Sequence, residues 1–162
     1  MKTEIITTPT NWQNLKYHPL SAVVAFGIGI QVDRLADFMR AHGYDDREPI
    51  VMWRDMILDG RHRHHAAVIA GVTPTFVRFV GKSPEVYVAK KAFRQHLSVS
   101  QRSMIAATIA TAPEGRPNQN KPISASLSDA ANLMGVGVSA VKDAVGESVA
   151  RPQFEVFAAH TA

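Results

Sequence analysis

A run of residues suited to binding an anion follows the apolar pair Ile57-Leu58 near the middle of the chain. It reads Asp59-Gly60-Arg61-His62-Arg63-His64-His65. The first turn of a helix exposes backbone N–H groups and the positive end of the helix dipole, glycine admits an anion to the backbone, and arginine matches phosphate oxygens. If this run opens a helix, it predicts a phosphate-binding site. A simpler interpretation is that Asp59 caps a surface helix and the basic residues are solvated.

The neighbouring segments would have to hold this run between a strand and a helix. Two short strands are predicted at Ile50–Trp53 and Met56–Leu58, joined at Arg54-Asp55. The helix of the run is predicted from about Gly60 to Ala70, with Gly71 at its end. Alternation of apolar and polar residues predicts another strand over 75–80. We expect the strand at 56–58 to lead directly into the helix and the strand at 75–80 to lie in the same sheet.

The remaining elements of the first half are predicted from spacing and helix-ending residues. A short strand is predicted at Ile5-Ile6, and residues 20–30 are predicted to be either a buried strand or a loop packed on the core. Apolar residues at helical spacing predict a helix from residue 31 to His42 that ends at Gly43. Ser83-Pro84-Glu85 predicts the start of another helix, which continues towards His96.

The last third of the chain reads as helical. Ser98 or Ser100 is predicted to cap a helix. Residues 111–126, which contain three prolines, two asparagines and one glycine, are predicted to be a loop. Residues 127–145 predict a helix-turn-helix, with an ordinary helical hairpin as the alternative. The residues behind this interpretation are two small residues for close packing, a turn glycine and two apolar residues between the helices: Ala130, Ala131, Gly135, Val136 and Val141.

Several of these segments resemble one known family. Asp59-Gly60-Arg61-His62-Arg63 resembles the Asp-Gly-x-His-Arg signature of the ParB/sulfiredoxin-like superfamily. Further similar segments occur in the same order and spacing, so the resemblance covers roughly residues 15–147: His18-Pro19-Leu20, Glu48–Val51, Ala70–Pro74 and Arg94–Arg102. The resemblance implies an α/β (α+β) fold, with a small mixed-sheet ParB/sulfiredoxin-like domain at 1–97. It also implies an all-α region at 98–150 with the helix-turn-helix at about 127–146, before a tail at 151–162.

The resemblance further implies a nucleotide site. Gly60, Arg61, His62 and Arg63 would bind the phosphates of a nucleoside triphosphate such as CTP or ATP. In ParB-like proteins a second motif, acidic-Asn-x-x-Arg, completes the nucleotide and metal site. Here the matching residues are Lys90-Lys91-Ala92-Phe93-Arg94, so the arginine is kept but lysines replace both metal-binding side chains. We therefore expect Lys91 and Arg94 to contact phosphate directly, and any triphosphate binding to be weak and independent of Mg²⁺.

Metal binding and catalysis are less favoured by these residues. His62 and His65 stand one helical turn apart while His64 points elsewhere, and no suitable carboxylate lies nearby in sequence, so we expect no metal site. Nuclease chemistry usually needs carboxylates to place a metal or activate water. Asp59, His62 and Arg63 are the catalytic candidates if the protein is a ParB-like nuclease or nucleoside triphosphatase, which we do not favour over a binding protein.

The predicted helix-turn-helix points to DNA. Its second helix would lie in the major groove and present Val138, Ser139 and Lys142, with Asp143 beside them. Phosphate contacts would come from four polar or basic residues, Gln101, Arg102, Arg116 and Lys121. With a single lysine at the base edges, we expect modest, salt-sensitive binding. Because the family's C-terminal dimerisation domain is not found after residue 150, we expect a homodimer to use another surface.

Composition fits this hypothesis. The 162 residues carry a net charge of +4 and no cysteine, which excludes thiol chemistry and the cysteine nucleophile of sulfiredoxin proper. The longest apolar run, Leu20 to Ile30, is about half as long as a membrane span, so we expect no membrane partner. No signal peptide is seen at the N-terminus, so we expect a cytoplasmic protein, bacterial or phage-encoded. The predicted function is plasmid, phage or mobile-element partition or transcriptional regulation. A protein-interaction module without either activity is a further alternative.

Overall fold

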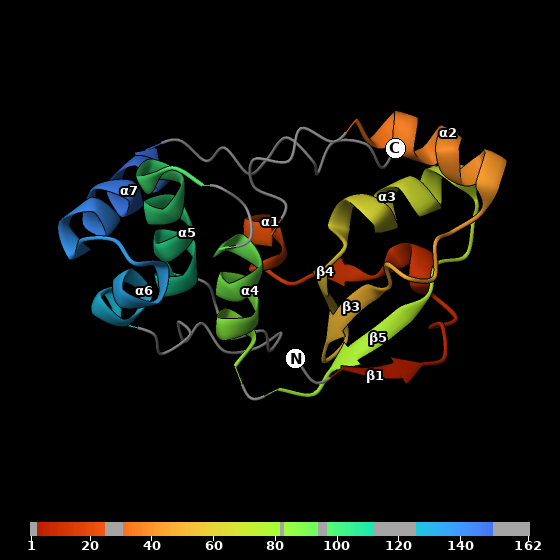
Figure 1. Ribbon diagram of the computed structural model, residues 1–162, viewed down its shortest axis with the longest axis horizontal. Helices are drawn as coiled ribbons and strands as arrows, with labels where there is room; N and C mark the ends of the chain where they lie inside the picture. Colours follow the sequence, from red (N-terminus) through yellow and green to blue (C-terminus); the bar gives the residue numbers. More distant parts are fainter. Residues whose placement is uncertain (1–2, 25–30, 82, 94–96, 112–125, 151–162) are drawn as a thin grey trace. The chain divides into compact units, whose positions relative to one another are not determined.

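The computed structural model describes residues 3–24, 31–81, 83–93, 97–111 and 126–150. The chain divides into Met1–Ala92, called unit 1 here, and Phe93–Ala162, called unit 2. Unit 1 contains a mixed sheet with helices, and the described part of unit 2 is helical (Figure 1). The α+β class predicted from the sequence is therefore confirmed. None of the helices in the described ranges is long and apolar enough to cross a membrane.

One five-stranded sheet organises unit 1, in the order β1-β5-β3-β4-β2. Its strands are β1 (Thr3–Ile6), β2 (Lys16–Tyr17), β3 (Ile50–Trp53), β4 (Met56–Asp59) and β5 (Phe76–Phe79). β1 pairs antiparallel with β5, and β4 antiparallel with β3, while the β3–β5 and β2–β4 pairs are parallel. The strands predicted at 56–58 and 75–80 thus lie in the same sheet, as expected.

The β3–β4 hairpin turns through two residues. Trp53 pairs with Met56, which leaves Arg54 and Asp55 in the turn. Arg54 has φ 54°, and it is the one described residue other than glycine with positive φ. Two-residue hairpin turns with positive φ at the first central position prefer glycine there, because a Cβ crowds the backbone. An arginine at this place therefore holds an unfavourable backbone conformation.

Unit 1 has four α-helices and one short 3-10 helix in its described ranges. They are η1 (Trp12–Asn14), α1 (Ser21–Val24), α2 (Val32–His42), α3 (Arg61–Ala70) and α4 (Pro84–Phe93). Gly43 and Gly71 end α2 and α3 with positive φ, and each donates its N–H to the preceding turn, as the sequence predicts.

The prediction for residues 20–30 was wrong where the structure describes them. Ser21–Val24 is helical rather than a strand or loop, and residues 25–30 lie outside the described ranges. The backbone N–H of His18 donates to the carbonyl of Ile57, and Ser21 then donates back to the His18 carbonyl. A contact with a strand far along the chain thus sets this helical turn, and apolar periodicity does not report such a contact.

The core of unit 1 lies between the sheet and the pair α2–α3. Small residues Ala66 and Ala67 on α3 are fully buried and let the helix approach the strands closely. The large side chains of this core come from β3, β4, β5, α2 and η1: Ile50, Met52, Ile57, Phe76, Met39 and Trp12. Burying each such side chain contributes about 1.5–3 kcal/mol. Phe79 points to the opposite face, where its ring lies 5.1 Å from that of Tyr87 on α4.

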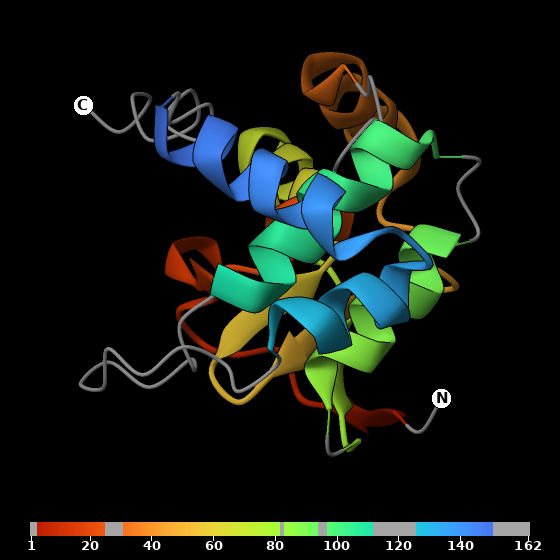
Figure 2. The same cartoon turned by 90° about the vertical axis from the view of Figure 1, so that its left-hand side faces the viewer.

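The described part of unit 2 is a set of three helices, α5 (Val99–Thr111), α6 (Leu127–Met134) and α7 (Val138–Ala150), which contact one another (Figure 2). Of the two predicted caps of α5, Ser98 is the right one. Its Oγ accepts from the N–H of Gln101, whose Oε1 accepts from the N–H of Ser98. The predicted loop falls almost wholly on residues 112–125 and the predicted tail on 151–162, all outside the described ranges.

Candidate functional site

Asp59 and Gly60 join β4 directly to α3, as the sequence predicts. Gly60 has φ 95° and ψ 21°, a left-handed conformation that ends the strand and begins the helix. A Cβ on Gly60 would lie 3.2 Å from Nη2 of Arg63 and 3.3 Å from Cα of Ile50. Glycine is therefore favoured at this position by the backbone angle, and the close approach of β3 leaves little room for a Cβ.

Asp59 is not the cap of α3, so that interpretation was wrong. Gly60 occupies the cap position and no side chain caps the helix. Asp59 is only 6% exposed; its Oδ2 accepts a hydrogen bond of 2.9 Å from the Tyr87 hydroxyl and lies 3.2 Å from Nζ of Lys91. A buried carboxylate needs such partners, and α4 supplies both of them.

Arg63 is also held by carboxylates. Its Nη1 lies 2.7 Å from Oε2 of Glu48, and its Nη2 lies 3.9 Å from Oδ1 of Asp59. The Arg63 side chain is 25% exposed, and its Nε is buried without a hydrogen-bond partner among the described residues. Two of the cations predicted to bind phosphate, Arg63 and Lys91, are therefore paired within the fold.

Arg61 and His62 lie at the half-buried start of α3. The Arg61 guanidinium sits 4.7 Å from the centre of the Tyr17 ring, a cation–π contact. Burial, followed by the charges of Arg61 and His65, lowers the pKa of His62 below its usual value. His62 is accordingly neutral at pH 7, where it offers an anion one N–H rather than a charge.

His64 fixes α3 to the N-terminal part of unit 1. Its Nε2 lies 2.7 Å from the carbonyl oxygen of Trp12, and its Nδ1 lies 2.7 Å from the Tyr17 hydroxyl. Because a carbonyl only accepts, Nε2 carries the proton and Nδ1 accepts from Tyr17. Burial lowers the pKa of His64 more than the Trp12 bond raises it. Both ring nitrogens of His64 are thus used within unit 1, and its role is structural.

The side chain that sequence reasoning missed here is Tyr87. Tyr87 and Lys91 are four residues apart, so they lie on one face of α4, and both reach Asp59. That spacing was the available signal. Arg94, the remaining predicted phosphate ligand, lies outside the described ranges. In the part of the chain that the structure describes, no three histidine, aspartate or glutamate side chains gather as a metal site would require.

The second candidate site is the turn between α6 and α7. Gly135 ends α6 with φ 61°, and Val136 donates its N–H to the Ala131 carbonyl. Ala130, Ala131 and Val141 are fully buried, as predicted. A capping box at Ser126 and Asp129 fixes the start of α6. The described geometry is that of two helices joined by a short glycine turn, which fits the predicted helix-turn-helix and the alternative of an ordinary helical hairpin alike.

The predicted DNA-contacting residues fall into two groups. Val138, which is 37% exposed, Ser139 and Lys142 lie on the surface at the start of α7, with Asp143 beside them. Gln101 and Arg102 instead serve the fold. The Oε1 of Gln101 accepts from the N–H of Ser98 at the start of α5, and Nη1 of Arg102 donates to the Met134 and Gly135 carbonyls at 3.4 Å each. Arg116 and Lys121 lie outside the described ranges.

No family model matches this sequence, and no curated protein matches it. The resemblance to the ParB/sulfiredoxin-like superfamily accordingly rests on the short motifs of the chain itself.

Proposed function

We propose that this protein is a ParB-like DNA-binding protein that places α7 in the major groove and acts in partition or transcriptional regulation of a plasmid, phage or other mobile element. The supporting observation is the division of α7 between two faces. Val141 of α7 is fully buried within unit 2, while Ser139 and Lys142 are exposed in the first turns of α7. A recognition helix uses the same division, with its N-terminal residues at the base edges.

The charge at the start of α7 defines the kind of binding. Lys142 is the one basic residue in the first turns, and Asp143 is adjacent to it. No arginine, asparagine or glutamine is present there for bidentate reading of a base. Binding of one subunit is therefore weak and mostly electrostatic, and a homodimer that presents two such helices would bind more tightly.

Unit 1 contributes an anion site in the same proposal. A phosphate at the start of α3 has to displace Glu48 from Arg63, or Asp59 from Lys91, before either cation is available. A nucleoside triphosphate, CTP or ATP, consequently binds weakly. It does so without Mg²⁺, because Lys90 and Lys91 stand where a metal-binding acid and amide would be.

The test of DNA binding is fluorescence anisotropy with a labelled duplex at about 50 mM salt. Lys142→Ala is expected to weaken binding and to reduce the slope of log affinity against log salt by about 1. Asp143→Asn, on the same exposed surface, is expected to strengthen binding because it removes a negative charge. Lys90→Ala in unit 1 is the matched control and is expected to leave binding unchanged.

Two results would overturn this proposal. One is that the wild-type protein shows no affinity for any duplex. The other is that Lys90→Ala weakens DNA binding as much as Lys142→Ala does. The first result favours a protein-interaction module, and the second favours contact by charge alone, without a defined helix in the groove.

An enzyme that uses Asp59, His62 and Arg63 is the alternative. No specific observation favours it, since Asp59 is already paired with Lys91 and Tyr87. Plasmid nicking and triphosphate hydrolysis, each measured with and without Mg²⁺, are expected to stay at background. Metal-dependent activity that disappears in Asp59→Ala or His62→Ala would establish the enzyme instead.

A further inference from the structure

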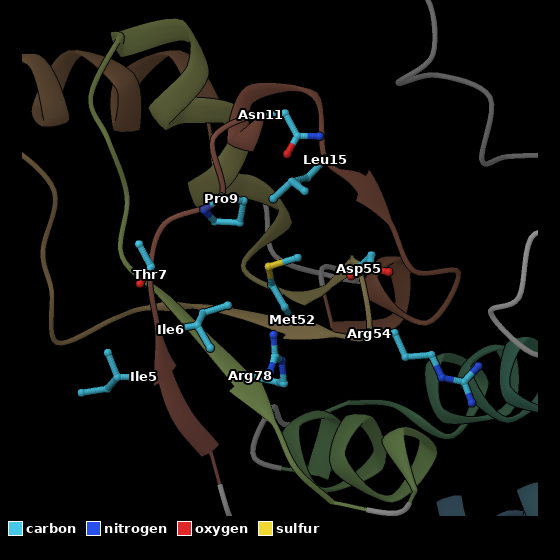
Figure 3. Close-up of a pocket in the computed structure, with 10 residues that line it drawn as sticks. All are labelled: Ile5, Ile6, Thr7, Pro9, Asn11, Leu15, Met52, Arg54, Asp55 and Arg78. Carbon is cyan, nitrogen blue, oxygen red and sulfur yellow. The ribbon is translucent and has the colours of Figure 1, made fainter.

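Unit 1 contains a hollow of about 670 Å³ beside the strands β1, β5 and β3, which reaches the turn between β3 and β4. Figure 3 shows the side chains around it. All of its lining residues belong to unit 1, and none of them belongs to the run Asp59–Arg63. Its volume lies within the range of pockets that hold small organic molecules, which is roughly 300–1,000 Å³.

The floor of the hollow is apolar. Met52, on β3, is 4% exposed, and Ile6 and Leu15 are half-buried beside it. Ile6 pairs with Phe76 and Met52 pairs with Arg78, so Ile6, Met52 and Arg78 come from three neighbouring strands and point to one face of the sheet (Figure 3). An apolar group placed here would displace water from the half-buried side chains of Ile6 and Leu15.

The rim of the hollow carries a net positive charge, with Arg54 and Arg78 against Asp55. Arg78 is exposed and forms no ion pair or hydrogen bond with another residue that the structure describes, although Glu4 stands opposite it in the strand register. This distinguishes it from Arg63, whose guanidinium is bound to Glu48. The Arg78 guanidinium is therefore available to an anion, and its planar fork matches a carboxylate.

The strained residue of the described chain also lines this hollow. Arg54 keeps a φ of 54° at a turn position that prefers glycine, and its guanidinium lies 5.5 Å from the centre of the Trp53 ring. Backbone strain at a residue with a side chain, where glycine would relieve it, is more frequent at ligand sites than elsewhere. The strain at Arg54 and the lack of a partner for Arg78 among the described residues are independent observations, and both residues line this hollow.

We propose that this hollow binds a small amphipathic carboxylic acid. The apolar body of the ligand rests on Ile6, Leu15 and Met52, and its carboxylate accepts hydrogen bonds from Arg78. This site is separate from the anion site at the start of α3 and does not depend on DNA binding.

The test uses 2-naphthoate as the probe and the ¹⁵N-labelled full chain as the protein, with backbone amide shifts followed by NMR. The amides of Ile6, Met52 and Arg78 are expected to shift and to saturate at millimolar probe. The uncharged amide, 2-naphthamide, is expected to bind at least about tenfold more weakly, because the charge-assisted bond to Arg78 is lost. Arg78→Gln is expected to weaken 2-naphthoate by about the same factor.

Arg34→Gln is the matched control, since Arg34 is an exposed arginine on α2 outside the hollow. It is expected to leave the affinity for 2-naphthoate unchanged. The proposal is overturned if no saturable shift occurs at these amides, if 2-naphthamide binds as well as 2-naphthoate, or if Arg78→Gln and Arg34→Gln bind equally. Because Arg78 is exposed on its strand, Arg78→Gln is expected to fold, which its amide spectrum verifies directly.

Discussion

The start of α3 and the start of α7 differ in what their basic residues do. The start of α3 is rich in arginine and histidine, yet Arg63 is bound to Glu48 and the nearby Lys91 to Asp59. The start of α7 has one lysine, and that lysine is exposed. The number of basic residues in a segment is therefore a poor measure of the charge available to a partner. Ion pairing within the fold decides how much of that charge remains.

The same difference predicts how the two regions respond to substitution. Charges at the start of α3 are part of the fold of unit 1, so removing one of them affects stability together with binding. Charges at the start of α7 face solvent, so we expect their removal to affect the proposed DNA binding and not the stability of unit 2. Substitutions that separate stability from binding are the direct way to test this comparison.

The largest expected effect comes from Val141→Asp. Val141 is fully buried between the helices of unit 2, and an unpaired carboxylate there costs several kcal/mol. We expect this variant to lose the helical content of unit 2 and all DNA binding, measured by far-ultraviolet circular dichroism and anisotropy. Val138→Asp, at the exposed start of the same helix, is expected to keep the fold and lose binding. A folded Val141→Asp variant that still binds DNA would contradict the proposed role of α7.

Acid is expected to weaken unit 1. His18 is buried, and burial together with the charge of Arg54 lowers its pKa to about 4. The unfolded chain takes up a proton near pH 6.5 and the folded chain only near pH 4, so stability is lost as the pH falls between these values. The loss amounts to about 2–3 kcal/mol at pH 4. The lowered pKa values of His62 and His64 act in the same direction.

Tryptophan fluorescence during urea unfolding at pH 7, 5 and 4 measures this effect, because Trp12 and Trp53, the two tryptophans, both lie in unit 1. His18→Asn keeps an acceptor for the Leu20 N–H and is expected to flatten the pH dependence. The described residues of unit 2 contain no histidine, so their helical signal should change less over this range. Equal acid sensitivity of His18→Asn and the wild type would contradict the assignment.

A smaller effect is expected from Asp59→Asn. The substitution keeps a hydrogen-bond partner for Tyr87 but removes the counter-charge of Lys91, so unit 1 should lose about 1–3 kcal/mol. The released cations should then bind inorganic pyrophosphate more tightly than in the wild type, as measured by calorimetric titration. Glu48→Gln, whose side chain is 64% exposed, should cost less than about 1 kcal/mol and release Arg63 only. Weaker pyrophosphate binding in both variants would show that these carboxylates position the anion site.

Local sequence features predicted most of the fold. Gly43, Gly71 and Gly135 end the helices where expected, and the strands β3, β4 and β5 lie within about one residue of their predicted places. These features are local, since a left-handed glycine or an alternating pattern needs no distant partner. The helical turn of α1 was missed because a bond from His18 to Ile57 sets it.

The candidate site was predictable in position but not in pairing. The join of β4 to α3 at Asp59-Gly60 followed from the turn and the helix pattern. Asp59 ends β4, whereas its partners Tyr87 and Lys91 lie on α4, and no pattern near Asp59 indicates them. The hollow beside Arg78 was not predicted either, because its walls come from segments scattered over residues 5–78.

The position of β1 at the edge of the sheet has a consequence for the order of folding. Thr3 pairs with Phe79, so β1 cannot dock until β5 exists, and closing so long a stretch of chain is slow. β1 has four residues, pairs on one side only and leaves Ile5 92% exposed, so it should open at a lower free energy than the interior strands β5, β3 and β4. Ile6 on this strand forms part of the floor of the hollow. A ligand in the hollow would therefore slow hydrogen exchange at β1 more than at any other strand of unit 1.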